Sequence, residues 1–253
     1  MKLSDRLQTI ASLVPAGSLP ADIGTDHAFL PIYLVSEGIC PRALAMDVKE
    51  GPLSRAREHI AQAELTEVIE TRLSDGIAAL EPGEADTLIL AGMGGDLSMR
   101  ILEEGRDKLR SIPNLVFSPQ SHVPQVRRYL HHLGYEITDE KLAEEDGKFY
   151  FAIQAKRGEN RPVGYERAVE YLFGAPLLAR KDPALRRYLE AETRRVGRIR
   201  ESLCAEGEKE MTPQNRARLC EVIQYSEQIA EAYSSFSSEG ASPSSSSASS
   251  AGF

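Results

Sequence analysis

Residues 19–35 read LPADIGTDHAFLPIYLV, and this stretch decides the fold. The apolar run 19–23 predicts a short strand, and residues 27–36 have the pattern of a helix. Gly24 sits in the turn between them, directly after a strand that ends in an acidic residue. This arrangement is typical of doubly wound α/β domains, in which the turn brings backbone close to a ligand at the carboxyl edge of a parallel sheet.

The same alternation of short apolar runs and amphipathic stretches continues along the chain. The predicted strands cover residues 19–23, 43–46, 68–73, 87–91 and 115–118, and the predicted helices cover residues 27–36, 52–63, 97–104 and 123–133. This order implies right-handed crossovers and a parallel sheet with helices on both faces. Strands at 135–142 and 149–156, joined by the polar turn 143–148, predict a hairpin that closes the sheet.

After residue 158 the strand pattern stops. Three stretches then have helical patterns, namely 164–179, 183–205 and 212–233. The last two predict an antiparallel, coiled-coil-like helical hairpin. The final segment, 234–253, contains eleven Ser and one charged residue, which predicts a disordered tail. The expected domains are an α/β body over 1–157, a helical domain over 158–233 and a tail over 234–253.

Composition excludes several classes of protein. With 253 residues, 42% of them hydrophobic, the chain can bury a core of one large or two small domains. There is no apolar run of the roughly 20 residues that span a bilayer, and no secretory signal at the start, so we expect a cytoplasmic protein. The three Cys and five His lack metal-ligand spacing, so we expect no metal site. The oligomeric state is open, and a monomer is compatible with the sequence.

The charge is unevenly distributed. The chain has a formal net charge of −8, and residues 1–157 carry 17 basic against 24 acidic residues. Residues 180–200 carry eight basic against three acidic residues. Such a stretch could bind a phosphate backbone or form a solvated helix face, and charge alone leaves both interpretations open. Its candidate RNA-binding residues are Arg186, Arg187, Arg194, Arg195, Arg198 and Arg200.

Acidic residues follow three consecutive predicted strands: Asp22, Asp47 and Asp75. The dinucleotide fingerprint G-x-G-x-x-G and the P-loop are absent, and Asp26 would repel a pyrophosphate at this helix start. S-adenosylmethionine (AdoMet) fits better, because its sulfonium and ammonium groups favour carboxylates and its ribose needs an acidic acceptor at the second strand end. Each aspartate alone could instead cap a helix or form a turn.

The fourth strand ends in Ala91, followed by Gly92-Met93-Gly94-Gly95. Glycines here permit close backbone approach or a positive φ. In AdoMet-dependent transferases this strand end usually lines the pocket of the methyl acceptor. A plain glycine turn before a helix is the structural alternative.

The runs DIGTDHAFLPIYLV, AMDV, LSDG, ILAGMGG and SPQ closely resemble the bacterial tRNA adenine-N1 methyltransferases that modify adenine 22. The resemblance covers about residues 1–157 and implies a Rossmann-like class I methyltransferase body, AdoMet as methyl donor and tRNA as substrate, with a helical domain that helps to hold tRNA. It implies a cofactor site formed by Asp22, Gly24, Asp26, His27, Asp47, Asp75, Gly76, Ala91 and Gly92. It also places Gly92, Met93 and Gly94 beside the target base. Ser118-Pro119 departs from the Gln-Pro of relatives, so we assign no role to the side chain at 118.

Adenine N1 already has a lone pair that can attack the methyl group. Methyl transfer therefore depends more on placing N1 in line with the departing sulfur than on a strong base. A nearby carboxylate would stabilise the positive charge of the product or accept a proton from N6. Asp26 is the first candidate and His27 the second. Asp26 could instead only bind the methionine end of AdoMet or cap the helix, and His27 could be a packed or capping histidine. The alternatives are a class I methyltransferase for a small molecule or protein, a non-catalytic AdoMet-binding RNA adaptor and, more remotely, a nicotinamide oxidoreductase.

Overall fold

The structure, a computed structural model, describes residues 2–158, 164–205 and 212–237. Its β-strands are β1 Pro20–Ile23, β2 Ala43–Asp47, β3 Ile69–Leu73, β4 Thr87–Ala91, β5 Asn114–Ser118, β6 Tyr135–Glu145 and β7 Lys148–Arg157. Its helices are α1 Asp5–Ala11, α2 Phe29–Ser36, α3 Glu50–Gln62, α4 Gly95–Glu104, α5 Val123–His132, α6 Ala168–Phe173, α7 Ala175–Ala179, α8 Pro183–Cys204 and α9 Pro213–Ser237, with a 3-10 turn, η1, at Lys108–Ser111.

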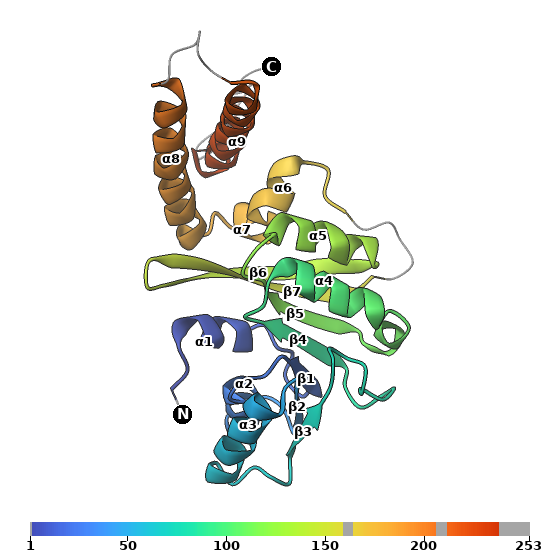
Figure 1. The fold of residues 1–253 in the computed structure, drawn as a ribbon. Coiled ribbons are helices and arrows are strands. Elements are labelled where there is room, and N and C mark those ends of the chain that lie inside the picture. The colour runs from blue at the N-terminus through green and yellow to red at the C-terminus, as the bar shows by residue number, and fades with distance from the viewer. Residues whose placement is uncertain (1, 159–163, 206–211, 238–253) are drawn as a thin grey trace, which may run out of the picture. The chain divides into compact units, whose positions relative to one another are not determined.

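The strands form one sheet in the order β3-β2-β1-β4-β5-β7-β6 (Figure 1). Strands β1 to β5 pair in parallel, whereas β7 pairs antiparallel with both β5 and β6. The antiparallel β7 lies between β5 and β6, which departs from the 3-2-1-4-5-6 order of dinucleotide-binding domains. The predicted doubly wound sheet with a closing hairpin is confirmed.

Two hydrophobic layers hold the sheet between helices. Leu88 and Leu90 of β4 point to the face covered by α4 and α5, and Ile89 between them points to the opposite face, which packs against α1 and α2 (Figure 1). Further along the second face, Ala43 and Ala45 of β2 pack against α3. This alternation fixes the register, since a shift of one residue would turn each strand's core side chains to the wrong face.

The structure corrects the predicted bounds of the hairpin. The turn consists of Asp146 and Gly147 rather than residues 143–148, and both have positive φ, at 50° and 70°. Positive φ at both positions is the geometry of the two-residue type I′ turn, for which Asp-Gly is a preferred sequence. The strands β6 and β7 are therefore longer than predicted.

The N-terminal helix α1 was not predicted. Ser4 caps it, since its hydroxyl accepts a hydrogen bond from the backbone N–H of Leu7 at 3.5 Å, and Ile10 is fully buried. The helix contacts the hairpin through Lys141, whose Nζ donates to Ser12 Oγ at 2.8 Å, and through Gln154, whose amide donates to the Leu13 carbonyl at 2.6 Å.

The described contacts divide the chain into two units, residues 1–188 and 189–253. The first unit therefore extends past residue 157, where the sequence predicts the end of the body. The predicted helix 164–179 is split into α6 and α7 at Gly174, and both belong to the first unit. In the second unit, the Tyr225 hydroxyl of α9 donates to Glu192 Oε2 of α8 at 3.1 Å.

The tail begins later than predicted. Helix α9 continues to Ser237, so residues 234–237, predicted to be disordered, are helical. The Ser234 and Ser235 hydroxyls each donate to a carbonyl three residues earlier at 2.6 Å, which satisfies these serines within the helix. Residues 238–253 lie outside the described residues. No helix in the described part of the chain is long and apolar enough to cross a membrane.

A buried ion pair connects α5, β6 and the α6–α7 segment. Arg127 donates to both carboxylate oxygens of Glu140 at 2.8 and 3.0 Å, and to the carbonyls of Tyr171 and Leu172 at 2.7 and 3.0 Å. Both charged side chains are completely buried. Gly174 has a φ of +89°, and a Cβ built there would lie 1.8 Å from Glu140 Oε2. The ion pair therefore requires glycine at this position.

We predict that Gly174→Ala lowers the free energy of unfolding by about 3 kcal/mol or more, because it adds backbone strain and displaces one partner of a buried ion pair. Chemical denaturation measures the loss. Gly134→Ala is the matched control, since Gly134 has a φ of +81° with no atom within 4 Å of the added Cβ. Equal losses in the two variants would contradict a role for the ion pair.

Candidate active site at the carboxyl edge of the sheet

The register of the parallel strands brings five loops to one edge of the sheet. Ile23 of β1 pairs with Met46 of β2 and with Leu90 of β4. On either side, Asp47 pairs with Leu73, and Ala91 pairs with Ser118. The loops after β1, β2, β3, β4 and β5 therefore begin at nearly the same height, which is the edge where α/β sheets bind ligands.

Backbone hydrogen bonds hold the turn after β1 against the end of β2. The N–H groups of Gly24 and Thr25 both donate to the Met46 carbonyl, at 2.8 and 2.9 Å. Gly24 has a φ of +79°, and a Cβ there would lie 2.9 Å from the Met93 methyl group. A side chain at this position would be strained and would also displace Met93. The Met93 side chain of the loop after β4 therefore packs against the Gly24 turn.

Asp22 is a buried carboxyl group at this turn. Burial raises its pKa to about 6, the neighbouring Thr25 partly opposes the shift, and the carboxylate of Asp47 adds to it. A buried carboxylate without a cation is costly, and a positively charged ligand at this edge would lower that cost. A cation at this edge would therefore be favoured over an anion.

Asp47 ends β2 and is half-buried at the strand tip. Its Oδ1 accepts a hydrogen bond from the Lys49 backbone N–H at 2.8 Å, which orients the carboxylate. Asp75 is exposed in the loop after β3. Gly76 has a φ of +54°, and a Cβ there would lie 2.8 Å from the side chain of Ile101, so this glycine lets α4 pack against the loop.

Large apolar side chains are exposed around the same edge. Phe29, Val48, Leu73 and Leu97 have exposed fractions of 37, 56, 55 and 41%. Val48 follows Asp47 directly, and Leu73 pairs with Asp47 across the sheet. A carboxylate beside exposed apolar side chains suits a ligand that combines hydroxyl groups with a flat ring system, such as a nucleoside.

The side chains of Asp26 and His27 contact α3. Asp26 forms an ion pair with Arg55, and His27 Nε2 lies 3.2 Å from Asp26 Oδ2. The His27 ring is stacked on Phe29 with centroids 5.0 Å apart, and its centroid is 5.3 Å from that of His59. Arg55 holds the pKa of Asp26 below its usual value. A carboxylate stabilised in this way is a weak base, so it is better suited to binding or charge stabilisation than to proton transfer.

The loop after β4 contacts the loop after β5. Gly92 N–H donates to the Ser118 carbonyl at 3.2 Å, and the Gln120 N–H donates to the Met93 carbonyl at 2.9 Å. A Cβ at Gly95 would lie 2.4 Å from the Ser121 carbonyl oxygen, and one at Gly94 would lie 3.3 Å from Ser121 Oγ. The glycines therefore let two loops form one continuous wall, beginning at Ala91.

The predicted site residues thus fall into two groups on either side of β1. Asp26 and His27 contact α3, which follows β2, whereas the loop 92–94 follows β4. No described contact joins Asp26 or His27 to that loop, so their predicted role beside a target base stays a prediction.

Two arginines at this edge were not predicted from the sequence. Arg55 pairs with Asp26, and the Arg6 guanidinium lies 3.9 Å from the position of a Cβ on Gly92. Ser4 followed by a hydrophobic pattern is a local signal for the start of α1, but the place of Arg6 at this edge depends on how α1 packs. Arg55 likewise reaches the turn after β1 only because α3 packs there in the folded chain.

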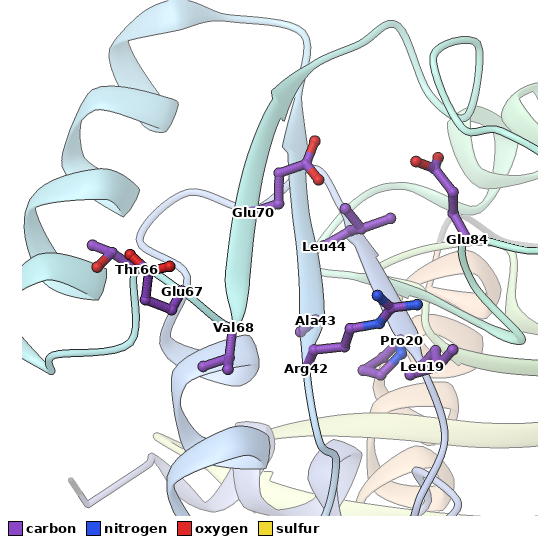
Figure 2. Close-up of a pocket in the computed structure, with 10 residues that line it drawn as sticks. All are labelled: Leu19, Pro20, Arg42, Ala43, Leu44, Thr66, Glu67, Val68, Glu70 and Glu84. Carbon is purple, nitrogen blue, oxygen red and sulfur yellow. The ribbon is translucent and has the colours of Figure 1, made fainter.

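A cavity of about 350 Å³ lies at the opposite edge of the sheet, where β1, β2 and β3 begin (Figure 2). Pro20, Ala43 and Val68 line it. Three acidic side chains lie on its wall: Glu67, Glu70 and Glu84. Glu70 and Glu84 form ion pairs with Arg72 at 2.6 Å each. The cavity thus lies at the end of the strands opposite to the Gly24 turn, and two of its three carboxylates are paired with an arginine.

The six predicted RNA-binding arginines are all exposed on α8. Arg187 pairs with Glu144 at 2.8 Å, and Arg195 pairs with Glu192 at 2.7 Å. Arg195 and Arg198 also line a hollow of about 280 Å³ between α8 and α9, together with Arg218, which the sequence analysis did not select. In the described ranges no group of three or more His, Cys, Asp or Glu could hold a metal ion.

Comparisons with known proteins identify the fold and the family of this chain. Residues 3–153 match a family model described as a methyltransferase domain. A Listeria monocytogenes protein has the same fold, with a TM-score of 0.86 and 29% identity over 92% of this chain and 100% of that one. A Streptococcus pneumoniae protein solved with S-adenosyl-L-methionine has a TM-score of 0.78 and 30% identity, over 91% of this chain and 99% of that one.

The chain is also 34% identical to the tRNA (adenine(22)-N(1))-methyltransferase of Bacillus subtilis, over 91% of this chain and 97% of the relative. The alignment therefore includes the helical C-terminal region as well as the sheet. The chain belongs to the family of bacterial tRNA (adenine(22)-N(1))-methyltransferases.

Proposed function

We propose that this protein transfers a methyl group from AdoMet to N1 of adenine 22 in tRNA. The observation that carries the proposal is the buried Asp22, with Asp47 near it, at the Gly24 turn of a family member. A buried carboxylate with a raised pKa favours a cationic ligand, and AdoMet carries both a sulfonium and an ammonium group.

The residues of the carboxyl edge fit AdoMet. The Asp47 carboxylate would accept hydrogen bonds from the ribose hydroxyls, and Val48 and Leu73 would cover the adenine. Asp75 and Gly76 follow β3, so they would lie near the adenine edge. The Gly24 turn and the Met93 side chain packed against it would lie beside the cofactor, and Asp22 would supply negative charge there. When bound, AdoMet supplies an electrophilic methyl group on sulfur.

The wall formed by the loops after β4 and β5 would hold the target adenine. Gly92, Met93 and Gly94 expose backbone there, which allows a flat base to approach closely. The reaction forms the N1–methyl bond as the sulfur–methyl bond breaks, so N1 must lie in line with the departing sulfur. The methylated base gains positive charge, which the carboxylates of this edge would stabilise. Asp26 remains the proposed group for that purpose, and His27 is the second candidate, as an acceptor of a proton from N6.

An adenine in folded tRNA must be accessible or be extruded, at a cost of a few kcal/mol. Phosphate contacts away from the pocket can offset this cost, and we propose that the exposed arginines of α8 supply them. The cytoplasm is the compartment that this substrate implies, and a monomer remains compatible with the chain.

The direct test is transfer of labelled methyl from AdoMet to unmodified tRNA transcripts, followed by digestion and mass spectrometry. We expect N1-methyladenosine at position 22 and no label in a transcript with guanosine there. AdoMet binding without label on any RNA would contradict the proposal and favour a small-molecule or protein methyltransferase, or a non-catalytic adaptor.

Asp22 gives a prediction on stability. Its pKa of about 6 lies above the unfolded value of about 3.8, so the folded state holds its proton more tightly. Asp22 therefore destabilises the fold as pH rises from about 4 to 6, by about 3 kcal/mol in full. We predict that Asp22→Asn raises the free energy of unfolding of the cofactor-free protein at pH 7 by about 1–3 kcal/mol and weakens AdoMet binding.

Denaturation at pH 7 and pH 4 measures this effect, and the gain should vanish at pH 4. Asp107→Asn is the matched control, because Asp107 is 98% exposed and its removal should change stability little. An Asp22→Asn gain that is equal at both pH values would show that charge burial is not its cause.

The arginines of α8 give a prediction on RNA binding. Arg194 and Arg198 lie four residues apart and so share a helix face. The double variant Arg194→Glu/Arg198→Glu should weaken tRNA binding about tenfold at physiological salt and leave AdoMet affinity unchanged. Filter binding across a salt series measures the change.

The control Arg106→Glu/Arg110→Glu makes the same charge change on exposed residues near the start of β5. An equal loss in both variants would refute a specific role for α8.

A further inference from the structure

Helices α4 and α5 both begin at the wall formed by the loops after β4 and β5, and they lie side by side (Figure 1). His122 directly precedes α5, and Asp96 lies in the first turn of α4. His122 Nδ1 lies 2.9 Å from Asp96 Oδ1. A histidine–aspartate pair therefore connects the two loops at the wall that would hold the target adenine.

The backbone around this pair is closely packed. A Cβ built on Gly95 would lie 3.2 Å from His122 Cβ and 2.4 Å from the Ser121 carbonyl oxygen. His122 has a φ of 53°, in the left-handed region that few residues other than glycine adopt, and its side chain does not cap α5. Strained backbone of this kind is concentrated at functional sites. The histidine therefore calls for a role other than starting the helix.

The pair determines which ring nitrogen of His122 can accept a hydrogen bond. A carboxylate only accepts, so Nδ1 carries the hydrogen that is donated to Asp96. In the neutral ring, Nε2 then has a lone pair and no hydrogen. The side chain is 51% exposed, and no hydrogen bond within the described ranges engages Nε2. His122 thus offers an acceptor that a substrate can reach.

His27 has the reverse arrangement. Its Nε2 lies 3.2 Å from Asp26 Oδ2, so the acceptor of its neutral ring is Nδ1. That nitrogen is buried and has no hydrogen-bond partner among the described residues. The ring is also stacked on Phe29. A substrate could reach the acceptor of His27 only if the ring moved, whereas the His122 ring needs no movement.

Adenine carries a matching donor next to the nitrogen that is methylated. Its N6 amino group lies beside N1 on the same edge of the base, whereas guanine has the carbonyl oxygen O6 in that place. When the N1–methyl bond forms and the sulfur–methyl bond breaks, the base gains a positive charge that N6 shares. A hydrogen bond donated by N6 therefore strengthens along the reaction, which lowers the barrier to methyl transfer.

We propose that His122, oriented by Asp96, accepts a hydrogen bond from N6 of the target adenine. The contact selects adenine over guanine, because Nε2 and the guanine O6 are both acceptors and would repel each other. This inference rests on the proposed function, since it takes the adenine as the substrate. His122 is then a catalytic residue that touches the reacting base, and Asp96 is a positioning residue that fixes the ring.

The test compares two tRNA substrates that differ only in N6. One carries adenosine at position 22, and the other carries purine riboside, which keeps N1 but lacks the amino group. Single-turnover methyl transfer from saturating AdoMet gives the rate, and each variant is compared with the unchanged protein on the same substrate. His122→Asn should lower the rate on adenosine about tenfold to hundredfold and leave the rate on purine riboside unchanged.

The variants are chosen to keep the fold. Asparagine tolerates the left-handed conformation at position 122, but its side chain is too short to replace Nε2. Glutamine can place an amide oxygen near the Nε2 position, so His122→Gln should restore part of the rate on adenosine. Asp96→Ala should lower the rate severalfold on adenosine only, because the ring keeps Nε2 but loses its fixed tautomer. The control His132→Asn, which alters an exposed histidine at the other end of α5, should change neither rate.

Two measurements without RNA separate this contact from a structural role. His122→Asn should unfold at the same temperature as the unchanged protein. It should also bind S-adenosylhomocysteine with the same affinity in isothermal titration calorimetry, since His122 is assigned to the adenine and not to the cofactor.

Three outcomes would overturn the inference. Equal losses on both substrates would make His122 a residue of the loop structure alone. A loss on adenosine only in His27→Asn, with none in His122→Asn, would assign the N6 contact to His27. Both of these outcomes leave the proposed function intact, because the unchanged protein still methylates adenosine 22. If the unchanged protein methylated neither substrate, the proposed function would fail together with this inference.

Discussion

The burial of Asp22 is the constraint on which the active site depends. The fold buries a carboxyl group at the end of β1, and burial raises its pKa to about 6. Burial of a carboxylate costs free energy, and a bound cationic ligand would offset that cost. The Gly24 turn and the carboxylate of Asp47 would place such a ligand at the junction of β1, β2 and β4.

The register of the parallel strands places the buried Asp22 next to the other residues of the candidate site. Because β1 pairs with β2 and with β4 at the same height, a cofactor above Gly24 can reach Asp47 on one side and the loop after Gly92 on the other. The antiparallel hairpin β6–β7 then extends the sheet and carries α1, which brings Arg6 to the same edge. Residues far apart in the sequence thereby lie along one edge of the sheet.

Local patterns predicted the strands β1 to β5, because the apolar runs and turn residues that form them are adjacent in the chain. The aspartates at the strand ends could be predicted for the same reason. The break at Gly174 could not, since it depends on Glu140 packing against that backbone from another element. Arg55 and Arg6 were missed because their place at the site comes from the packing of α3 and α1. The turn of the hairpin could have been predicted from the sequence, because Asp146-Gly147 is itself a local signal for a two-residue turn.

The central claim is that the protein holds AdoMet through a carboxyl group buried by the fold, and the most direct measurement is the proton released on binding. Calorimetry of AdoMet binding at pH 5, in buffers of different ionisation enthalpy, reports that number. At this pH Asp22 is mostly protonated in the free protein, given its pKa of about 6. The account predicts release of close to one proton, which disappears in Asp22→Asn. Binding without proton release at pH 5 would contradict it.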